Sequence, residues 1–185
     1  LDRVQIKRFI KEMKISISLQ HPNIVKVFAV RRQDWNYFGL MEFLDTDLSK
    51  AIRNKPELFT QEKVLDMIKQ AGAGMDYIHR NGIVHKDMSP SNILVSYSLE
   101  KVKITDLGLA RKTGFLQKDN GSGGTEGYIA PERMNGRQAD VKSDIYSFGK
   151  TVEKIYAELG FPMPDNVRYV VETAVKQKPE ERFYD

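Results

Sequence analysis

The sequence predicts an α+β domain whose C-terminal part is mostly helical. Two apolar stretches near the N-terminus, residues 24–30 and 37–43, have the length and composition of strands. Longer stretches at 60–80 and 143–159 carry apolar residues at helical spacing. Because the longer strands come first and the helices later, with only short strands inserted, this order favours α+β over alternating βαβ units.

The composition is that of an ordinary globular domain. The chain has 185 residues, enough for one domain with a real core, and a net charge of +4 spread along its length. This mild basic excess is a weak indication of nucleic-acid binding, so we expect no nucleic-acid partner. The absence of cysteine excludes disulfides and thiolate zinc sites and fits a reducing, cytoplasmic compartment. No apolar run approaches the ~18 to 20 residues of a membrane span.

The N-terminal region is predicted to be a helix followed by the two strands. Residues 3–19 place apolar side chains on one helical face, namely Ile6, Phe9, Ile10, Met13 and Ile17. Asp2 is a candidate cap for this helix. Pro22 ends it, because proline disfavours helical backbone at the preceding residue.

The central part is predicted to contain a long helix and several short strands. Thr60 is a plausible N-cap for a helix that runs to Arg80, and Gly82 lies just past its end. The buried stripe of this helix is expected to consist of Val64, Met67, Ile68, Ala71, Met75 and Ile78. Short strands are expected at 83–84, 93–95 and 102–105.

The C-terminal part is predicted to begin with a long loop and to end in two helices. Residues 109–129 are rich in glycine, lysine and polar side chains, and a loop of that length is usually functional or disordered. Ser143 is a candidate cap for a helix to Leu159, with Ile145, Phe148, Val152 and Ile155 pointing inward. A last helix is expected over about 165–176.

Three segments, in a fixed order, indicate the chemistry. They are His85-Lys86-Asp87-Met88-Ser89-Pro90-Ser91-Asn92, then Asp106-Leu107-Gly108, then Ala130-Pro131-Glu132. Asp87 can accept the proton of a hydroxyl group, while Asn92 and Asp106 can hold Mg²⁺ against the phosphates of a nucleotide. Each acid or amide alone would most often stabilise a turn. The three segments together are far more specific than any one of them.

On these motifs the chain resembles a protein kinase domain of the serine/threonine type over nearly its whole length. The resemblance implies a kinase-like fold with a partial N-lobe at 1–43, from helix C to the hinge, and a helical C-lobe at 44–185. It implies ATP and Mg²⁺ as cofactors and Ser/Thr hydroxyls of proteins as acceptors. The glycine-rich loop and its following lysine are not found, so we expect a domain incomplete at both ends, with weak or no activity alone.

The resemblance also implies a nucleotide site. Glu12 matches the helix glutamate that positions the nucleotide-binding lysine of the family. Met41-Glu42-Phe43-Leu44 resembles the hinge, where backbone groups of Glu42 and Leu44 would meet the adenine beside Met41. Leu94 would form the floor beneath the base.

Residues on the acceptor side are implied by the same resemblance. Residues 124–132 look like the substrate-facing end of an activation loop. Thr125 would hydrogen-bond toward Asp87, with Ser89 beside the substrate.

Four further positions are expected to support the fold. His85 would be a packing and hydrogen-bonding residue rather than the base. Glu132 would form an ion pair with Arg182, and Asp144 would brace the catalytic loop from the start of a helix.

The chain departs from the family pattern at several positions. Leu107 replaces the usual phenylalanine and keeps an apolar side chain, whereas Lys86 replaces an arginine and loses its bidentate fork. Ser16 occupies a position that is usually apolar. Ser89 stands where serine/threonine kinases usually have lysine, so it supplies no positive charge; losing one such contact lowers a rate by about 10²–10³-fold.

Two other functions are compatible with the same motifs. A pseudokinase or scaffold module would use the fold to bind nucleotide or partners without catalysis, as Ser89 and Ser16 would favour. A small-molecule phosphotransferase of the aminoglycoside-kinase type shares the His-x-Asp-x₄-Asn loop. Residues 124–132 and Arg182 argue against the latter, because that chemistry needs no platform for a peptide.

Overall fold

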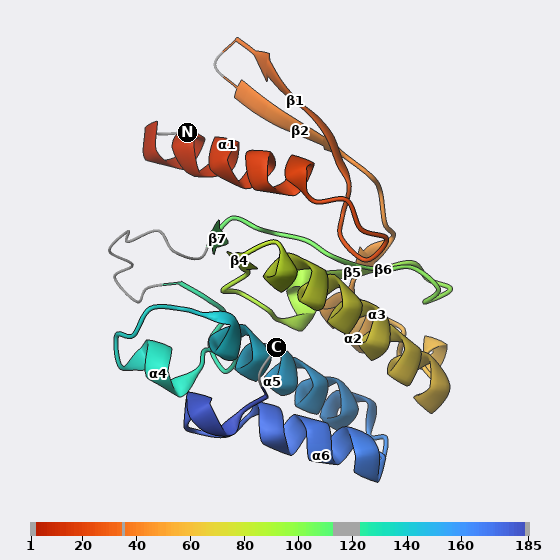
Figure 1. Ribbon diagram of the computed structural model, residues 1–185. Coiled ribbons are helices and arrows are strands. Elements are labelled where there is room, and N and C mark those ends of the chain that lie inside the picture. Colours follow the sequence, from red (N-terminus) through yellow and green to blue (C-terminus); the bar gives the residue numbers. More distant parts are fainter. Residues whose placement is uncertain (1–2, 35, 113–122, 184–185) are drawn as a thin grey trace.

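The computed structural model describes residues 3–34, 36–112 and 123–183 (Figure 1). The elements in chain order are α1 (Arg3–Ser18), β1 (Val27–Gln33), β2 (Asn36–Met41), β3 (Thr46–Asp47), α2 (Leu48–Asn54), α3 (Gln61–Arg80), β4 (Ile83–Val84), β5 (Ile93–Val95), β6 (Val102–Ile104), β7 (Arg111–Lys112), α4 (Pro131–Met134), α5 (Val141–Leu159) and α6 (Asp165–Ala174). Single 3₁₀ turns occur at Pro56–Leu58, Pro90–Asn92 and Pro179–Glu181. This is the predicted α+β architecture.

The strands form three small antiparallel groups. β1 pairs with β2, β5 lies between β3 and β6, and β4 pairs with β7. Figure 1 shows α1 and the β1–β2 hairpin together at one end of the molecule, while α3, α5 and α6 stack at the other. The short strands and the loops between them lie in the middle. None of the helices in the described ranges is long and apolar enough to cross a membrane.

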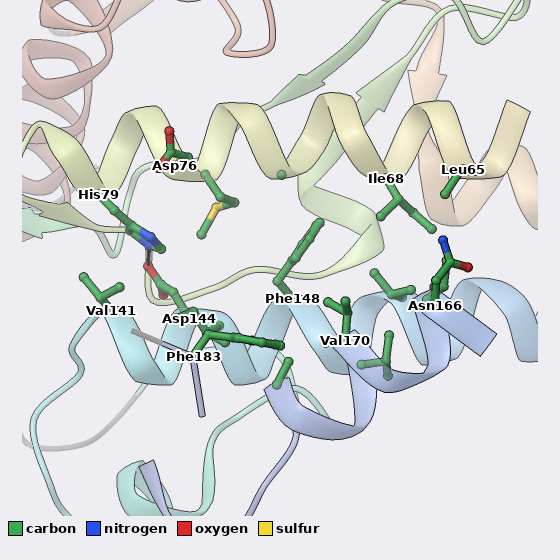
Figure 2. Close-up of a pocket in the computed structure, with 18 of the residues that line it drawn as sticks. Leu65, Ile68, Asp76, His79, Val141, Asp144, Phe148, Asn166, Val170 and Phe183 are labelled. Carbon is green, nitrogen blue, oxygen red and sulfur yellow. Dashed lines mark hydrogen bonds and ion pairs between the residues drawn. The ribbon is translucent and has the colours of Figure 1, made fainter. Parts of the chain in front are cut away.

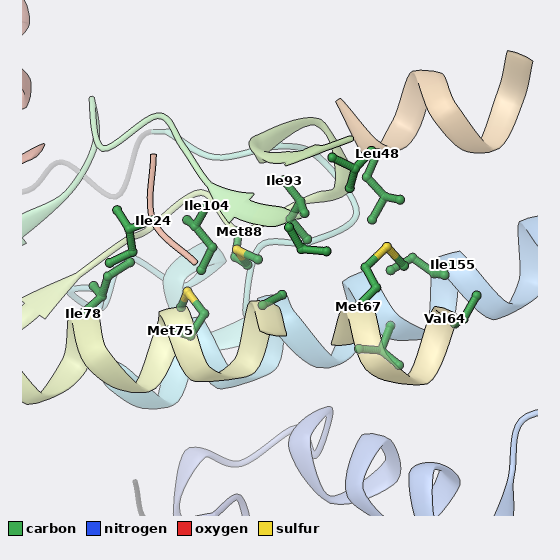
Figure 3. Packing of buried hydrophobic residues seen from close by; sticks show 14 of the residues in the cluster. Ile24, Leu48, Val64, Met67, Met75, Ile78, Met88, Ile93, Ile104 and Ile155 are labelled. Carbon is green, nitrogen blue, oxygen red and sulfur yellow. The ribbon is translucent and has the colours of Figure 1, made fainter. Parts of the chain in front are cut away.

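The main core lies where α3 meets β5, β6 and α5 (Figure 3). The predicted stripe of α3 is buried at Val64, Met67, Ala71, Met75 and Ile78, whereas Ile68 is only partly buried. It packs with strand residues such as Ile93 and Ile104 and with Ile155 of α5. Met88 is fully buried in the same cluster. Because Met88 directly follows Asp87, the core itself anchors the predicted catalytic loop.

The helix predictions were partly right. Thr60 caps α3, since its hydroxyl accepts a hydrogen bond from Lys63 N at 3.3 Å. The prediction for Ser143 was wrong, because Asp140 is the N-cap of α5 and accepts from Ser143 N at 2.9 Å. Ser143 is instead the third helical residue of a capping box, in which its hydroxyl oxygen accepts a hydrogen bond from Asp140 N at 3.1 Å. α6 ends at Ala174 rather than at residue 176.

The predicted stripe of α1 was wrong at its C-terminal end. Ile17 is 42% exposed, whereas Ile15 and Leu19 are buried in the main core. The helix has two partners: Met13 packs under Gly39 of β2, and the last turn meets the main core. A Cβ at Gly39 would lie 2.8 Å from the Met13 sulfur, so glycine permits the close approach of helix and hairpin. The buried face therefore turns along the helix.

Several elements were shifted or missed. The first strand pair lies at 27–33 and 36–41 rather than 24–30 and 37–43. β3, α2 and α4 were not predicted, and β7 lies inside the segment expected to be loop. Asp2 and residues 113–122 lie outside the described residues.

Candidate active site

A buried carboxylate at the start of α5 organises the predicted catalytic loop. Asp144 is fully buried and accepts hydrogen bonds from His85 N at 2.7 Å and Lys86 N at 2.8 Å. His79 Nε2 donates to the same carboxylate at 3.0 Å. The first turn of a helix favours a negative charge, because its amide groups point toward it. The bracing contact expected of Asp144 is therefore present, with His79 as an additional member.

The ring of His85 links the backbone of the loop to the strand beside it. Its Nδ1 accepts from Asp87 N at 3.3 Å, and its Nε2 donates to Thr105 O at 3.1 Å. Both nitrogens of this fully buried ring are thus used by the backbone. His85 thus makes the packing and hydrogen-bonding contacts that were expected of it, and it ties Asp87 to the residue that precedes Asp106.

Asn92 is brought next to both predicted acids. Its Nδ2 donates to Asp87 O at 2.7 Å, which leaves the amide oxygen available as an acceptor or metal ligand. Its own carbonyl accepts from Thr105 N at 3.0 Å, in line with the antiparallel pairing of β5 and β6. The two strands therefore place Asn92 beside Thr105, one residue before Asp106. The three residues predicted to perform the chemistry meet in one region.

Asp106 and Glu12 form a pair of acids beside Gly108. Asp106 has a φ of 60°, and its Oδ1 accepts from Gly108 N at 3.1 Å. A Cβ at Gly108 would lie 3.2 Å from Glu12 Oε2 and 3.0 Å from Asp106 Oδ1, so α1 brings Glu12 to the same place. Burial, and then the charge of Asp106, raise the pKa of Glu12 to about 7. Among the described residues, no cation offsets these two effects.

This arrangement fits a magnesium ion that arrives with a nucleotide. Mg²⁺ is usually held by one or two protein oxygens together with phosphates and water, rather than by a cage of side chains. The described part of the chain contains no cluster of three or more His, Cys, Asp or Glu suited to a metal. It does contain an amide oxygen at Asn92 and a carboxylate at Asp106, next to Glu12, whose pKa is raised first by burial and then by the charge of Asp106. These residues fit the ion.

Thr125 contacts Asp87 from the acceptor side. Its backbone N and its hydroxyl donate to Asp87 Oδ1 at 2.7 and 2.8 Å. Both bonds use the same oxygen, which leaves Oδ2 for another donor. The hydroxyl of Ser89, which is 1% exposed, lies 3.5 Å from that of Thr125 and 2.9 Å from that of Ser91. Ser89 thus contributes a buried hydroxyl to this network and no charge.

The expected ion pair between Glu132 and Arg182 is present and buried. Arg182 Nη1 and Nη2 donate to the two carboxylate oxygens of Glu132 at 2.7 and 2.8 Å, with side-chain exposures of 0% and 6%. The guanidinium also donates to carbonyls of Lys176, Lys142 and Gln177. This pair ties α4 to the turn that follows α6, and it holds the segment after Thr125 in place.

The hinge residues are only partly gathered. Met41, Glu12 and Asp106 line one small cavity together with Leu107 and Ser16. Glu42, Leu44 and Leu94 are not among the residues that line it. The backbone N of Glu42 donates to Lys26 O at 2.9 Å, and its carboxylate pairs with Lys103 Nζ at 2.8 Å. A contact of the Glu42 backbone with a base would therefore use its carbonyl.

Two residues that sequence reasoning missed contribute to this region. His79 belongs to none of the motifs, but its place in the last turn of α3 puts it against Asp144. Arg133 donates to two backbone carbonyls, those of Lys86 and Gly123. Neither contact has a sequence signal: no motif joins His79 to Asp144, and the carbonyls that Arg133 binds leave no trace in side-chain identity.

A separate cavity of about 670 Å³ lies between α3, α5 and α6 (Figure 2). Its walls are mostly apolar, with Ile68, Phe148 and Val170 among them. The hydrogen-bonded side chains of His79 and Asp144 lie at one end. The predicted catalytic residues Asp87, Asn92 and Asp106 do not line it. Cavity size therefore does not locate the predicted active site, which is defined by its hydrogen bonds.

The fold and the site together define a class of protein. In a mostly helical domain, a loop held by Asp144 places Asp87 and Asn92 near Asp106, which is the set of groups used by phosphoryl-transfer enzymes. Comparison with known families agrees, since the model of the protein kinase domain matches residues 2–179. The chain belongs to the protein kinase domain family.

Individual relatives are bacterial and eukaryotic kinases. The chain is 35% identical over 150 residues to the probable serine/threonine-protein kinase PknB of Lactococcus lactis subsp. lactis (strain IL1403). This alignment covers 80% of this chain and 24% of that protein. It is 33% identical over 151 residues to the serine/threonine-protein kinase PrkC of Bacillus subtilis (strain 168), covering 80% and 23%. The chain thus spans about a quarter of the length of these relatives.

A solved structure supports the fold. The crystal structure of the yeast RNA Pol II CTD kinase CTDK-1 complex contains a chain that superposes with a TM-score of 0.75 at 28% identity. The match covers 82% of this chain and 50% of the other.

Proposed function

We propose that this domain transfers the γ-phosphoryl group of ATP to serine or threonine hydroxyls of protein substrates, with Mg²⁺ as cofactor. The observation that best supports this is the position of Asp87. Its Oδ1 is occupied by Thr125, while its backbone is tied to Asn92 and, through His85, to the residue before Asp106. One oxygen of the base is thus left for an acceptor beside the proposed metal ligands.

The roles of the residues follow from this geometry. Asp87 Oδ2 would accept the proton of the acceptor hydroxyl and orient its oxygen for attack on the phosphorus. Asn92, through its amide oxygen, and Asp106 would hold the metal. The ion, when bound, neutralises charge on the phosphate oxygens. Thr125 keeps Asp87 in one rotamer, and Ser89 lies beside it as a neutral neighbour of the substrate.

The nucleotide would bind between the two parts of the chain, which we divide at residues 43 and 44. Met41, Glu42 and Leu44 would border the adenine, above Leu94. Glu12 would pair with a cation at the phosphates, which its raised pKa supports because a nearby positive charge would relieve it. Consistent with use of ATP and with a chain free of cysteine, we place this reaction in the cytoplasm.

The direct test is phosphate transfer by the full-length protein from labelled Mg-ATP to a panel of protein substrates. Replacing Asp87→Asn should lower the rate by about 10²–10⁴-fold, the range typical of a lost general base. Glu62→Gln, an exposed acid in the first turn of α3, is the matched control and should leave the rate unchanged. Equal rates for the Asp87 variant and the parent would remove the catalytic proposal.

The second candidate is a nucleotide-binding module without catalysis. It is favoured by the buried, uncharged Ser89 at a position where transfer benefits from a positive charge. In this case Mg-ATP raises the melting temperature and no phosphate is transferred. Asp106→Asn should abolish the part of that increase that depends on Mg²⁺, and its retention would argue against Asp106 as a ligand.

A further inference from the structure

Arg133 is a buried cation between the two segments that form the acceptor side. The residue is 3% exposed and lies in α4, directly after Glu132. Its Nη1 donates to Lys86 O at 2.7 Å and its Nη2 donates to Gly123 O at 2.6 Å. Hydrogen bonds from a charged donor are stronger than neutral ones, and burial strengthens them further. The guanidinium therefore joins two backbone positions that are far apart in sequence.

These two positions flank the contact between Asp87 and Thr125. Lys86 precedes Asp87, and Gly123 precedes Thr125 by two residues. The bonds of Arg133 and the bonds of Thr125 to Asp87 Oδ1 are thus two ties between the same pair of segments. A shift of either segment would stretch both ties.

The backbone between the two ties is shaped for this approach. Gly124 has a φ of 122°, a conformation that side chains with a Cβ rarely adopt. A Cβ there would lie 3.3 Å from Lys86 O and 3.4 Å from Arg133 Nη1. Glycine thus lets the chain pass close to the guanidinium and its acceptor.

We propose that Arg133 is a positioning residue for the phosphoryl-acceptor site. Its planar fork fixes residues 123–125 against the catalytic loop, so that Thr125 occupies Asp87 Oδ1 and Oδ2 is left for the incoming hydroxyl. The consequence for turnover rests on the proposed kinase function, whereas the tie itself is a property of the fold. Arginine suits the task because its two terminal nitrogens reach two carbonyls at fixed geometry, and lysine offers a single nitrogen.

This role differs from general support of α4. The helix is held independently by the ion pair of Glu132 with Arg182, which Arg133 does not touch. Removal of the Arg133 guanidinium should therefore loosen residues 123–125 and leave the helix docked. That expectation separates a positioning residue from a purely structural one.

The experiment compares Arg133→Met, Arg133→Lys and the control Arg137→Met in the full-length protein. Arg137 is an exposed arginine in the same segment, so its variant removes a charge without the tie. Hydrogen exchange of amides 123–128 should become faster by roughly tenfold in Arg133→Met, the effect of one lost hydrogen bond. kcat should fall by about 10²-fold with the KM for ATP unchanged, because a misplacement of about 1 Å suffices for such a loss.

Each outcome decides the proposal. Arg133→Lys should give exchange and kcat values between those of the parent and Arg133→Met, and it replaces that variant if the methionine form does not fold. Unchanged exchange at 123–128, or equal effects of Arg133→Met and Arg137→Met, would overturn the positioning role. If the parent protein transfers no phosphate, the kinase proposal fails, while the exchange measurement still tests the tie.

Discussion

The surroundings of Asp144 and of Glu12 are opposite in kind. Asp144 is fully buried and its carboxylate accepts from His85 N, Lys86 N and His79 Nε2. Glu12 is half-buried beside Asp106, and its pKa is raised to about 7 because nothing in the described structure compensates the two effects on it. The charge of Asp144 is stabilised by donors of the chain itself. The charge of Glu12 has no such stabilising partner among the described residues. The first region has the contacts of a structural support, and the second is the region where we propose that a cation binds.

Buried charged groups whose partners all belong to the chain, such as the Glu132–Arg182 pair, should respond most strongly to mutation. Arg182→Met leaves the buried carboxylate of Glu132 without its bidentate partner, so we expect a loss of about 3–5 kcal/mol in the free energy of unfolding. Urea denaturation measures it. Lys178→Met removes an exposed cation paired with Glu181 at 3.7 Å and should change stability little. Similar losses for both would show that the buried pair is not special.

Asp144→Asn tests a second buried carboxylate with a smaller chemical change. The amide keeps the shape and one acceptor but loses the charge that strengthens the bonds from His85 and Lys86. We expect a loss of about 2–3 kcal/mol, measured by thermal or urea unfolding. Glu158→Gln on the exposed side of the same helix serves as control. A loss below that of the control would contradict the view that Asp144 organises the loop.

Removal of the charge at Glu12 should have the opposite effect and raise the free energy of unfolding. With a folded pKa of about 7 against 4.5 in the unfolded chain, Glu12 binds a proton more readily when folded. Stability should therefore fall as pH rises from about 4.5 to 7. Glu12→Gln should raise the free energy of unfolding at pH 8 by on the order of 1 kcal/mol, a value reduced for partial solvation, and flatten the pH profile.

Urea titrations at pH 5 and pH 8 provide the measurement. Mg-ATP should diminish the difference between the parent and Glu12→Gln, because a cation would then compensate the acids. A variant less stable than the parent at pH 8 would show that Glu12 already has a compensating partner.

The smallest effect on stability is expected for an ion pair that is exposed to solvent. Asp76 and Arg80 form an exposed pair at 2.9 Å on α3, with side-chain exposures of 51% and 78%. Asp76→Asn should change the free energy of unfolding by less than about 0.5 kcal/mol, since exposed pairs are screened by water. A larger change, measured by the same urea titration, would mean that surface charge rather than burial separates the regions.

The sequence predicted best what local pattern and paired side chains specify. The stripe and cap of α3 follow from helical period and a threonine at the right place, and the structure has both. The contacts of Thr125 with Asp87 and of Glu132 with Arg182 were implied by the resemblance to protein kinases, and both are present in the structure. Their roles in a reaction stay predictions.

What escaped prediction depends on partners distant in sequence. Ile17 and Ile15 are equivalent by hydrophobicity, and only the position of the core decides which is buried. α2 is seven residues long, too short for periodicity to distinguish it from loop. The pKa of Glu12 arises from burial and from Asp106, which lies more than ninety residues away in the chain. Arg133 binds carbonyls, which every residue has.

The backbone at Asp106 has an evolutionary consequence. Its φ of 60° is unfavourable for a residue with a Cβ by about 1 kcal/mol, and glycine adopts it freely. Exchange of this acid for glycine would delete a ligand of the proposed ion and relax the main chain in one step. A chain with glycine at this position is therefore expected to keep the architecture while losing the proposed metal ligand.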